Sequence, residues 1–197
     1  MVEARRWQVC TKTSRVPRAG HDGSTARLRA RLSSGAVHTV VMTVSTSVSR
    51  RDAEDLSGPL LAHLAEDAGA EIVAMEVVPD DLALIEDRLH HYVDKRVTFI
   101  FTTGGTGLTA DDITPEATWA VIAREAPGIA EAMRAVSTQH TPMGMLSRGV
   151  AGVAGQTLIV NFPGSPKAIE QLFPVLAPVL AHAAATLGSD GGSRASH

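Results

Sequence analysis

The stretch VTFIFTTGGTG, residues 97–107, gives the clearest indication of the fold. Residues 97–101 form a continuous run of apolar and β-branched side chains, which is typical of a strand buried on both faces of a parallel sheet. Residues 102–107 form a glycine-rich loop directly after that strand. Ligands of open parallel sheets bind beyond the carboxyl ends of the strands, so this junction predicts a binding site at one edge of a sheet.

Strand and helix patterns alternate on the N-terminal side of this stretch. Apolar runs over 37–44 and 71–78 predict two more buried strands. A helix is predicted over 58–68, and another begins at 79–81. The order strand, helix, strand, helix, strand is typical of a parallel sheet with right-handed crossovers. We therefore expect an α/β fold with three layers, α/β/α, around a mostly parallel, Rossmann-like central sheet.

The C-terminal half continues with weaker signals. A helix is expected from Thr114 as N-cap, with a proline at the first helical position, and further helical sequence covers 129–139. A strand is predicted over 157–161. The turn at 163–166 then starts a last helical stretch, in which two prolines predict a break or kink. The segment 45–57 is predicted to be a polar loop.

Charge divides the chain into unequal parts. Residues 1–36 carry eight basic and two acidic residues (net +6), and the remainder carries ten and nineteen (net −9), which together give the −3 of the whole chain. We expect 1–36 to be a disordered basic arm, either a tether for a nucleic acid or a partner, or an extension without a selected role. Residues 37–187 are predicted to form one domain, and 188–197 a flexible tail. An acidic domain with 4% aromatic residues is a poor candidate for binding nucleic acid.

Composition limits the class of protein further. Hydrophobic residues make up 44% of the 197 residues and charged residues 20%, as in ordinary globular domains. The single cysteine, Cys10, excludes a disulfide within the chain and a cysteine metal site. The sequence predicts no membrane-spanning run and no secretory signal, so we expect a cytoplasmic protein that binds no membrane.

Four loops should meet at the carboxyl edge of the sheet. The glycines of 102–107 let backbone amides approach an anion closely, although a tight structural turn explains them equally well. Asp111 and Asp112 follow that loop, and paired carboxylates beside a phosphate need a cation such as Mg²⁺; the alternative is a helix N-cap. Asp80 and Asp81 stand at another strand-to-helix junction, where one should cap the helix and the other face the site.

Two further segments carry polar side chains toward the same edge. Ser165 could cap a helix or bind a phosphate at the helix N-terminus, and Asn161 could bind a heterocycle. Arg148, beside Ser147, is one of few cations in the acidic domain. A guanidinium suits phosphate recognition, and a surface salt bridge is the alternative.

The motifs TTGGTG at 102–107, DITPEA at 112–117, SR at 147–148 and NFPGSP at 161–166 stand in a specific order and spacing. Together they make residues 37–187 resemble the Mog/MoaB family, the molybdopterin-binding domain. The resemblance implies an α/β/α domain that assembles as a homotrimer or a hexamer. It also implies adenylyl transfer from Mg-ATP to the phosphate of molybdopterin, with release of pyrophosphate.

The resemblance assigns roles residue by residue. It implies that Asp112 and Asp80 are catalytic, with Asp112 near Mg²⁺, and that the loop with Asp55 and Ser57 acts as a lid. Substrate contacts are implied for residues of the glycine loop, of the Pro-Gly-Ser turn and of the Ser-Arg pair: Thr103, Gly104, Gly105, Thr106, Gly107, Pro163, Gly164, Ser165, Ser147 and Arg148.

One position departs from the family pattern. After the first strand the family usually carries Ser-Asp, whereas this chain has Ser45-Thr46 and so lacks one carboxylate at the ligand edge. A non-catalytic molybdopterin binder or carrier of the same family is therefore the main alternative. A domain of the competence-damage type that acts on other nucleotides, and an interaction protein without a ligand, are the other two.

Overall fold

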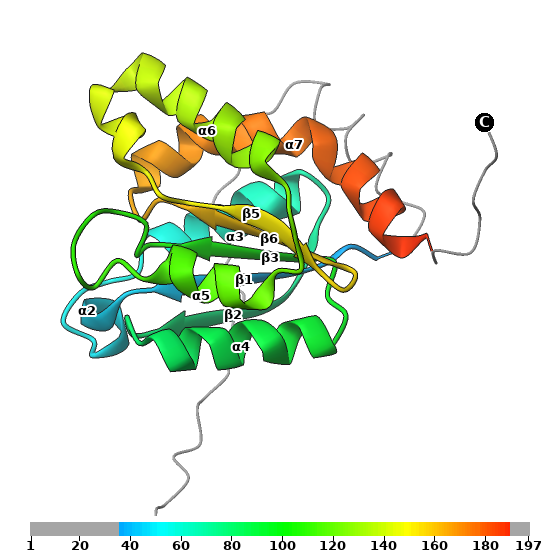
Figure 1. The fold of residues 1–197 in the computed structure, drawn as a ribbon, viewed down its shortest axis with the longest axis horizontal. Coiled ribbons are helices and arrows are strands. Elements are labelled where there is room, and N and C mark those ends of the chain that lie inside the picture. Colours follow the sequence, from blue (N-terminus) through cyan, green and yellow to red (C-terminus); the bar gives the residue numbers. More distant parts are fainter. Residues whose placement is uncertain (1–35, 190–197) are drawn as a thin grey trace, which may run out of the picture.

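The computed structural model describes residues 36–189 (Figure 1). The basic arm predicted over 1–36, apart from its last residue, lies outside the described residues, as does most of the tail predicted over 188–197. Within the described part, helices cover both faces of one sheet (Figure 1).

The central sheet has six strands in the order β2-β1-β3-β6-β5-β4. The strands β2, β1, β3 and β6 run parallel, β5 pairs antiparallel with β6, and β4 pairs antiparallel with β5. The predicted α/β fold with a mostly parallel sheet is therefore confirmed. The strands are β1 (His38–Val44), β2 (Glu71–Val78), β3 (Phe99–Thr103), β4 (Arg124–Glu125), β5 (Ala151–Ala154) and β6 (Thr157–Phe162).

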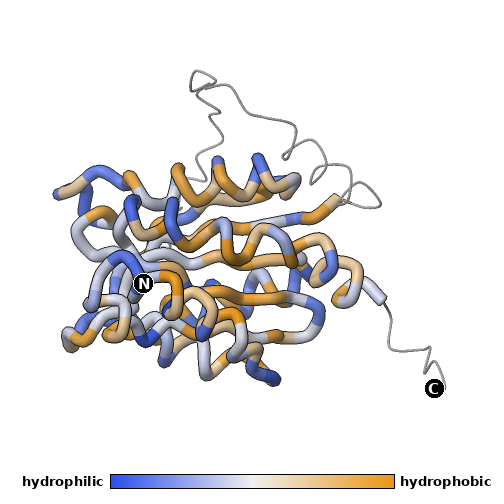
Figure 2. Tube along the Cα trace, turned by 90° about the horizontal axis from the view of Figure 1, so that it is seen from above, coloured by the Kyte–Doolittle hydropathy of each residue, from blue (hydrophilic) through white to orange (hydrophobic). Residues whose placement is uncertain are grey.

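Two apolar cores define the layers, because successive side chains of a strand point to opposite faces. Phe99 and Phe101 face one core, and Ile100 between them faces the other. The helices α3 (Ser57–Asp67), α6 (Pro127–His140) and α7 (Pro166–Gly188) cover the first core, and α4 (Leu82–Asp94) and α5 (Thr114–Val121) the second. Figure 2 shows hydrophobic segments along the sheet and hydrophilic residues recurring along the outer helices.

The four phenylalanines of the chain gather in one cluster. Phe101 contacts the rings of Phe99, Phe162 and Phe173 at centroid distances of 5.6, 5.8 and 6.2 Å. Offset and edge-on ring pairs at such distances stabilise a core beyond their area burial. The cluster ties β3 and β6 to α7, and these elements carry the glycine loop and the Pro-Gly-Ser turn.

Helix α7 bears on two predictions. It runs from Pro166 to Gly188 without a break, with Pro174 and Pro178 inside it, so the predicted break is wrong and a kink stays a prediction. With 23 residues and a mean hydropathy of 1.4, it is also long and apolar enough to cross a membrane by length and composition alone. Its inward stripe packs with α3 and α6 in the first core, and 28% of its apolar window is buried.

Four elements were not predicted. The one-turn helix α2 (Thr46–Ser49) stands inside the expected polar loop, and β4, β5 and the 3₁₀ helix η1 (Pro142–Leu146) precede β6. The alanines and glycine of β5 give weak strand signals. Gly152 is required there, because a Cβ atom would lie 2.8 Å from the Arg124 carbonyl oxygen of the paired β4.

Candidate active site

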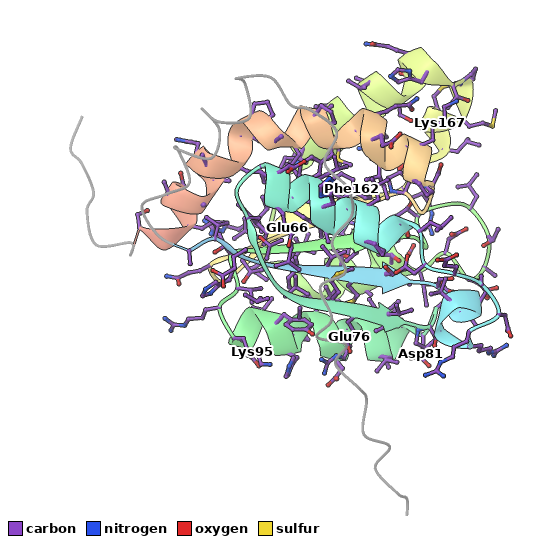
Figure 3. The ribbon with its side chains drawn as sticks, turned by 180° about the vertical axis from the view of Figure 1, so that it is seen from behind. Glu66, Glu76, Asp81, Lys95, Phe162 and Lys167 are labelled. Atoms are coloured by element: carbon purple, nitrogen blue, oxygen red, sulfur yellow. The ribbon has the colours of Figure 1, made fainter. Side chains whose placement is uncertain are left out.

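Two neighbouring cavities lie at the edge where the parallel strands end. Asp81, at the start of α4, and Lys167, in the first turn of α7, lie at this edge of the sheet (Figure 3). One cavity, of about 460 Å³, is lined by acidic side chains and glycines. The other, of about 440 Å³, is lined mostly by apolar ones. We call them the acidic cavity and the apolar cavity.

The acidic cavity collects carboxylates from three loops. Asp55 comes from the loop before α3, Asp80 follows β2, and Asp111 and Asp112 follow the glycine loop. Three of these carboxylates share one device, a threonine hydroxyl that donates to a carboxylate oxygen. A carboxylate held in this way is fixed in one orientation. The pairs are Thr43–Asp55 at 2.7 Å, Thr46–Asp80 at 2.8 Å and Thr109–Asp112 at 2.7 Å.

Asp80 and Thr46 hold each other reciprocally. The backbone amide and the hydroxyl of Thr46 both donate to Asp80 Oδ2, at 2.7 and 2.8 Å, and the amide of Asp80 donates back to Thr46 Oγ1 at 3.0 Å. Asp81 instead accepts from the amide of Leu84 and caps α4. The prediction that one of the two aspartates caps the helix is confirmed, and the other, Asp80, lines the acidic cavity.

Asp112 is fixed by its own loop. Its Oδ2 accepts from the amide of Thr109 at 2.8 Å and from the Thr109 hydroxyl. Partial burial raises the pKa of Asp112, but the hydrogen bonds from Thr109 and the Gly107 amide and the charge of Arg148 outweigh burial, so the pKa lies below its ordinary value. The carboxylate is therefore ionised at neutral pH.

Asp55 is engaged through both of its oxygens. Oδ1 accepts from the amide and hydroxyl of Ser57 and from the amide of Gly58, and Oδ2 accepts from Thr43. These contacts anchor the predicted lid segment to β1 and to the start of α3. In this structure the segment forms one wall of the acidic cavity.

The glycine loop has a conformation that side chains would prevent. Gly104 and Gly105 have φ angles of +99° and +61°, and a Cβ atom would lie 2.3 Å from the Val44 carbonyl oxygen at the first and 2.4 Å from Thr114 Oγ1 at the second. The expected N-cap role of Thr114 is wrong: it is the first helical residue of α5, and its hydroxyl donates to the Gly104 carbonyl oxygen at 2.9 Å. The Thr114 hydroxyl therefore bonds the Gly104 carbonyl oxygen instead of capping the helix.

The amides of the glycine loop are not all available to an anion. The amide of Gly104 donates to Phe162 O at 3.2 Å, and that of Gly107 donates to Asp112. No described residue accepts from the amide of Gly105 or Thr106. Only the amides of Gly105 and Thr106 could therefore bind an anion, which is fewer than the sequence suggested.

Arg148 fastens the loop from the other side. Its Nε donates to the Gly107 carbonyl oxygen at 2.6 Å, one terminal nitrogen donates to the Asp112 carbonyl oxygen, and the other pairs with Glu116. Its backbone amide also donates to Thr106 O at 3.0 Å. The guanidinium predicted to contact a phosphate is engaged with the protein itself.

Asn161 lies under the loop in a buried polar network. Its amide nitrogen donates to the hydroxyls of Thr102 and Thr118, both at 2.9 Å, and its oxygen accepts from the Val150 amide. Because its donor and acceptor groups are occupied, the structure shows Asn161 as a brace between β3, β6 and α5, although it borders the apolar cavity.

The apolar cavity lies between α6, η1 and the start of α7. Met133, Met143 and Leu172 are among its apolar lining residues, and Arg134 is the charged one. Methionine side chains adapt to flat or irregular ligands. The side chains that the three helices contribute to this cavity had no signal in the sequence, because they stand at ordinary helical spacing.

The wall between the cavities is made by the two predicted phosphate loops. Gly105 and Gly164 line the acidic cavity, whereas Thr106, Pro163 and Ser165 line the apolar one. The loops are in direct contact, because a Cβ atom on Gly164 would lie 3.3 Å from Gly104 Cα. Gly105 and Asp112 therefore line the acidic cavity, and Ser165 lines the apolar cavity on the other side of the shared wall. The remaining expected contact residues are Thr103 and Gly104 at the acidic cavity, and Gly107 and Ser147 at the apolar one.

Known proteins match most of the described domain. A family model described as "Probable molybdopterin binding domain" matches residues 40–182. The chain is 35% identical over 147 residues to the molybdopterin adenylyltransferase of Helicobacter pylori, which covers 73% of this chain and 84% of that protein. It is 37% identical over 152 residues to the molybdenum cofactor synthesis protein cinnamon of Drosophila melanogaster, covering 76% of this chain. The chain spans only 22–50% of the length of cinnamon and two other curated relatives.

A solved structure gives the same result. The molybdopterin biosynthesis enzyme MoaB of Thermus thermophilus superposes with a TM-score of 0.73 at 41% identity, covering 78% of this chain and 98% of that one. The fold is therefore shared along nearly the whole length of that protein.

Proposed function

The chain belongs to the family described as probable molybdopterin-binding domains, and from this premise we propose that it is a molybdopterin adenylyltransferase of molybdenum cofactor biosynthesis. The proposed reaction joins the phosphate of molybdopterin to the adenylyl group of Mg-ATP and releases pyrophosphate. The observation that carries the proposal is the pair of cavities of opposite chemistry that meet at one wall of glycine and serine backbone.

The acidic cavity suits the nucleotide with its magnesium ion. Triphosphate and carboxylates repel each other, so a cation must stand between them. Among residues 36–189, no group of three or more His, Cys, Asp or Glu side chains is arranged to hold a metal ion. Mg²⁺ is typically held by one or two carboxylates together with phosphate oxygens, and Asp112, with Asp80 in support, fits that hard oxygen donor set. When bound, the ion would screen the charge of the triphosphate.

The apolar cavity suits the pterin. A flat heterocycle can pack between Met133 and Met143, while Ser137 and Thr141 offer hydroxyls to its polar edge. The phosphate that hangs from the pterin would then reach the wall between the cavities. There the amides of Gly105 and Thr106 can receive it, together with the N-terminus of α7.

The chemistry needs positioning more than proton transfer. A phosphate monoester carries close to two negative charges at neutral pH, so its oxygen can attack without a general base. It would attack the α-phosphorus in line; the new oxygen–phosphorus bond forms as the bond to the leaving pyrophosphate breaks. The wall residues would hold the attacking phosphate, and the fixed carboxylates would keep the triphosphate in one orientation.

The wider setting is part of the same proposal. We propose a cytoplasmic homotrimer, or hexamer, without nucleic acid or membrane as partner. The acidic charge of the domain supports the first exclusion, since nucleic-acid binding depends on basic surfaces. A non-catalytic carrier would use the same two cavities and differ only in the absence of turnover.

The decisive test is an adenylation assay with the full chain, molybdopterin, Mg²⁺ and ATP. We expect pyrophosphate release in equal amount to adenylylated molybdopterin, and none when either substrate is omitted. Binding of both substrates without pyrophosphate would identify a carrier instead.

A further inference from the structure

One side chain connects the walls of both cavities. Arg148 follows η1, whose residues line the apolar cavity, and Ser147 beside it lines that cavity too. From there the guanidinium crosses to the glycine loop and bonds the carbonyl oxygens of Gly107 and Asp112. Arg148 therefore joins the segment after η1, at the apolar cavity, to Asp112 of the acidic cavity.

We propose that Arg148 is a positioning residue that sets the place of Asp112 and couples the seating of the pterin to the arrangement of the acidic cavity. The coupling to catalysis rests on the proposed function; the positioning does not. Thr109 holds the carboxylate of Asp112, but Arg148 is what bonds its backbone carbonyl. Both anchors are needed to fix one side chain in space.

The contacts of the guanidinium distinguish this role from phosphate binding. Its Nε and both terminal nitrogens are turned toward three acceptors of the protein, two carbonyls and the Glu116 carboxylate. A planar fork can reach three acceptors at fixed angles, whereas the ammonium of a lysine is a single point. The arrangement thus requires arginine for its shape and not only for its charge.

The test compares Arg148→Ala and Arg148→Lys with the wild-type chain in the adenylation assay. We expect kcat to fall about 100-fold in both, since small misplacements of a reacting geometry have effects of that order, while KM for molybdopterin and for ATP changes less than about threefold. Added guanidinium ion should restore part of the kcat of Arg148→Ala and should leave the kcat of a control unchanged. The control is Arg88→Ala, which breaks another partly exposed arginine ion pair, with Glu76 on α4 and β2, and should keep wild-type kinetics.

Two kinetic outcomes would overturn the proposal. If either Arg148 variant raises KM with kcat unchanged, Arg148 binds substrate directly. If both variants keep wild-type kcat and KM, Arg148 does not position Asp112 for the reaction.

A second readout is independent of the reaction. Amide hydrogen exchange of residues 106–114 should become faster in both variants, while exchange in the strands of the sheet should stay unchanged. If the wild-type chain transfers no adenylyl group, the proposed function fails, and exchange alone then decides whether Arg148 holds this loop. Unchanged exchange at 106–114 would contradict the positioning role.

Discussion

The acidic cavity and the apolar cavity are nearly equal in volume, about 460 and 440 Å³, yet opposite kinds of side chain line them. The first presents carboxylates, three of them held by threonine hydroxyls. Among the described residues that line the second, none is acidic. Size therefore does not distinguish the two cavities, whereas charge and polarity do, and on that difference the proposed function assigns the nucleotide to the acidic cavity and the pterin to the apolar one.

Removing the carboxylate of Asp112 should break this division most severely. We expect Asp112→Ala to lower the rate of adenylyl transfer by about 10²–10³-fold, because fixed charge at the reacting phosphates contributes on that scale. Molybdopterin binding should persist, since the apolar cavity is untouched. Stopped-flow transfer and equilibrium binding measure the two effects. Asp87→Ala, on the exposed face of α4, is the control, and equal rates in the two variants would remove Asp112 from the mechanism.

A negative charge in the apolar cavity should act on one substrate only. Met143 lines that cavity and is 64% exposed, so Met143→Glu should fold normally. Repulsion of the pterin phosphate should raise KM for molybdopterin about tenfold and leave KM for ATP unchanged. Met145, 68% exposed on the same 3₁₀ helix, does not line the cavity, so Met145→Glu should behave as wild type. A rise in KM for ATP instead would reverse the assignment of the cavities.

Loss of the Thr46 hydroxyl should have an intermediate effect. Thr46→Val removes a hydrogen bond to a charged group and leaves Asp80 held by one amide, so we expect kcat/KM for ATP to fall about tenfold. Thr46→Ser keeps the hydroxyl and should keep the rate. If valine and serine behave alike, the hydroxyl does not orient Asp80.

The smallest effect concerns stability and pH. Because the pKa of Asp112 is lower in the folded chain than its ordinary value, its ionised form stabilises the fold above the ordinary pKa of about 4, and this contribution disappears as the pH falls through the folded pKa. The difference in unfolding free energy between the wild-type chain and Asp112→Asn should therefore shrink below about pH 4. Denaturant unfolding from pH 7 to pH 3 measures it, and a difference that grows on acidification contradicts the direction of the shift.

The sequence predicted the central strands because their signals are strong. Residues 97–101 are apolar without interruption, and the observed β3 is buried along its whole length. The two-residue β4 and the alanine-rich β5 have no such signal, since pairing with neighbours rather than side-chain pattern creates them. Local pattern therefore predicts the parallel core of the sheet and misses its antiparallel edge.

The site was predictable only where residues adjacent in sequence act together. Asp80 and Asp81 divided their roles as expected, because helix capping is a local rule. The engagement of Arg148 with Gly107 and Asp112 spans 36 or more positions, so no local rule could show that the guanidinium serves the loop. The spacing of Thr109, three residues before Asp112, could have predicted their hydrogen bond, but this aspartate was interpreted only as a metal ligand or a helix cap.

The division of ligands between the two cavities has one direct test. Mg²⁺ with α,β-methylene-ATP, which cannot lose pyrophosphate, is titrated calorimetrically onto the chain saturated with molybdopterin. The two-cavity arrangement predicts a ternary complex, with one nucleotide bound per chain at nearly the affinity seen without molybdopterin. Displacement of molybdopterin by the nucleotide would contradict it, because two ligands that exclude each other share a single cavity.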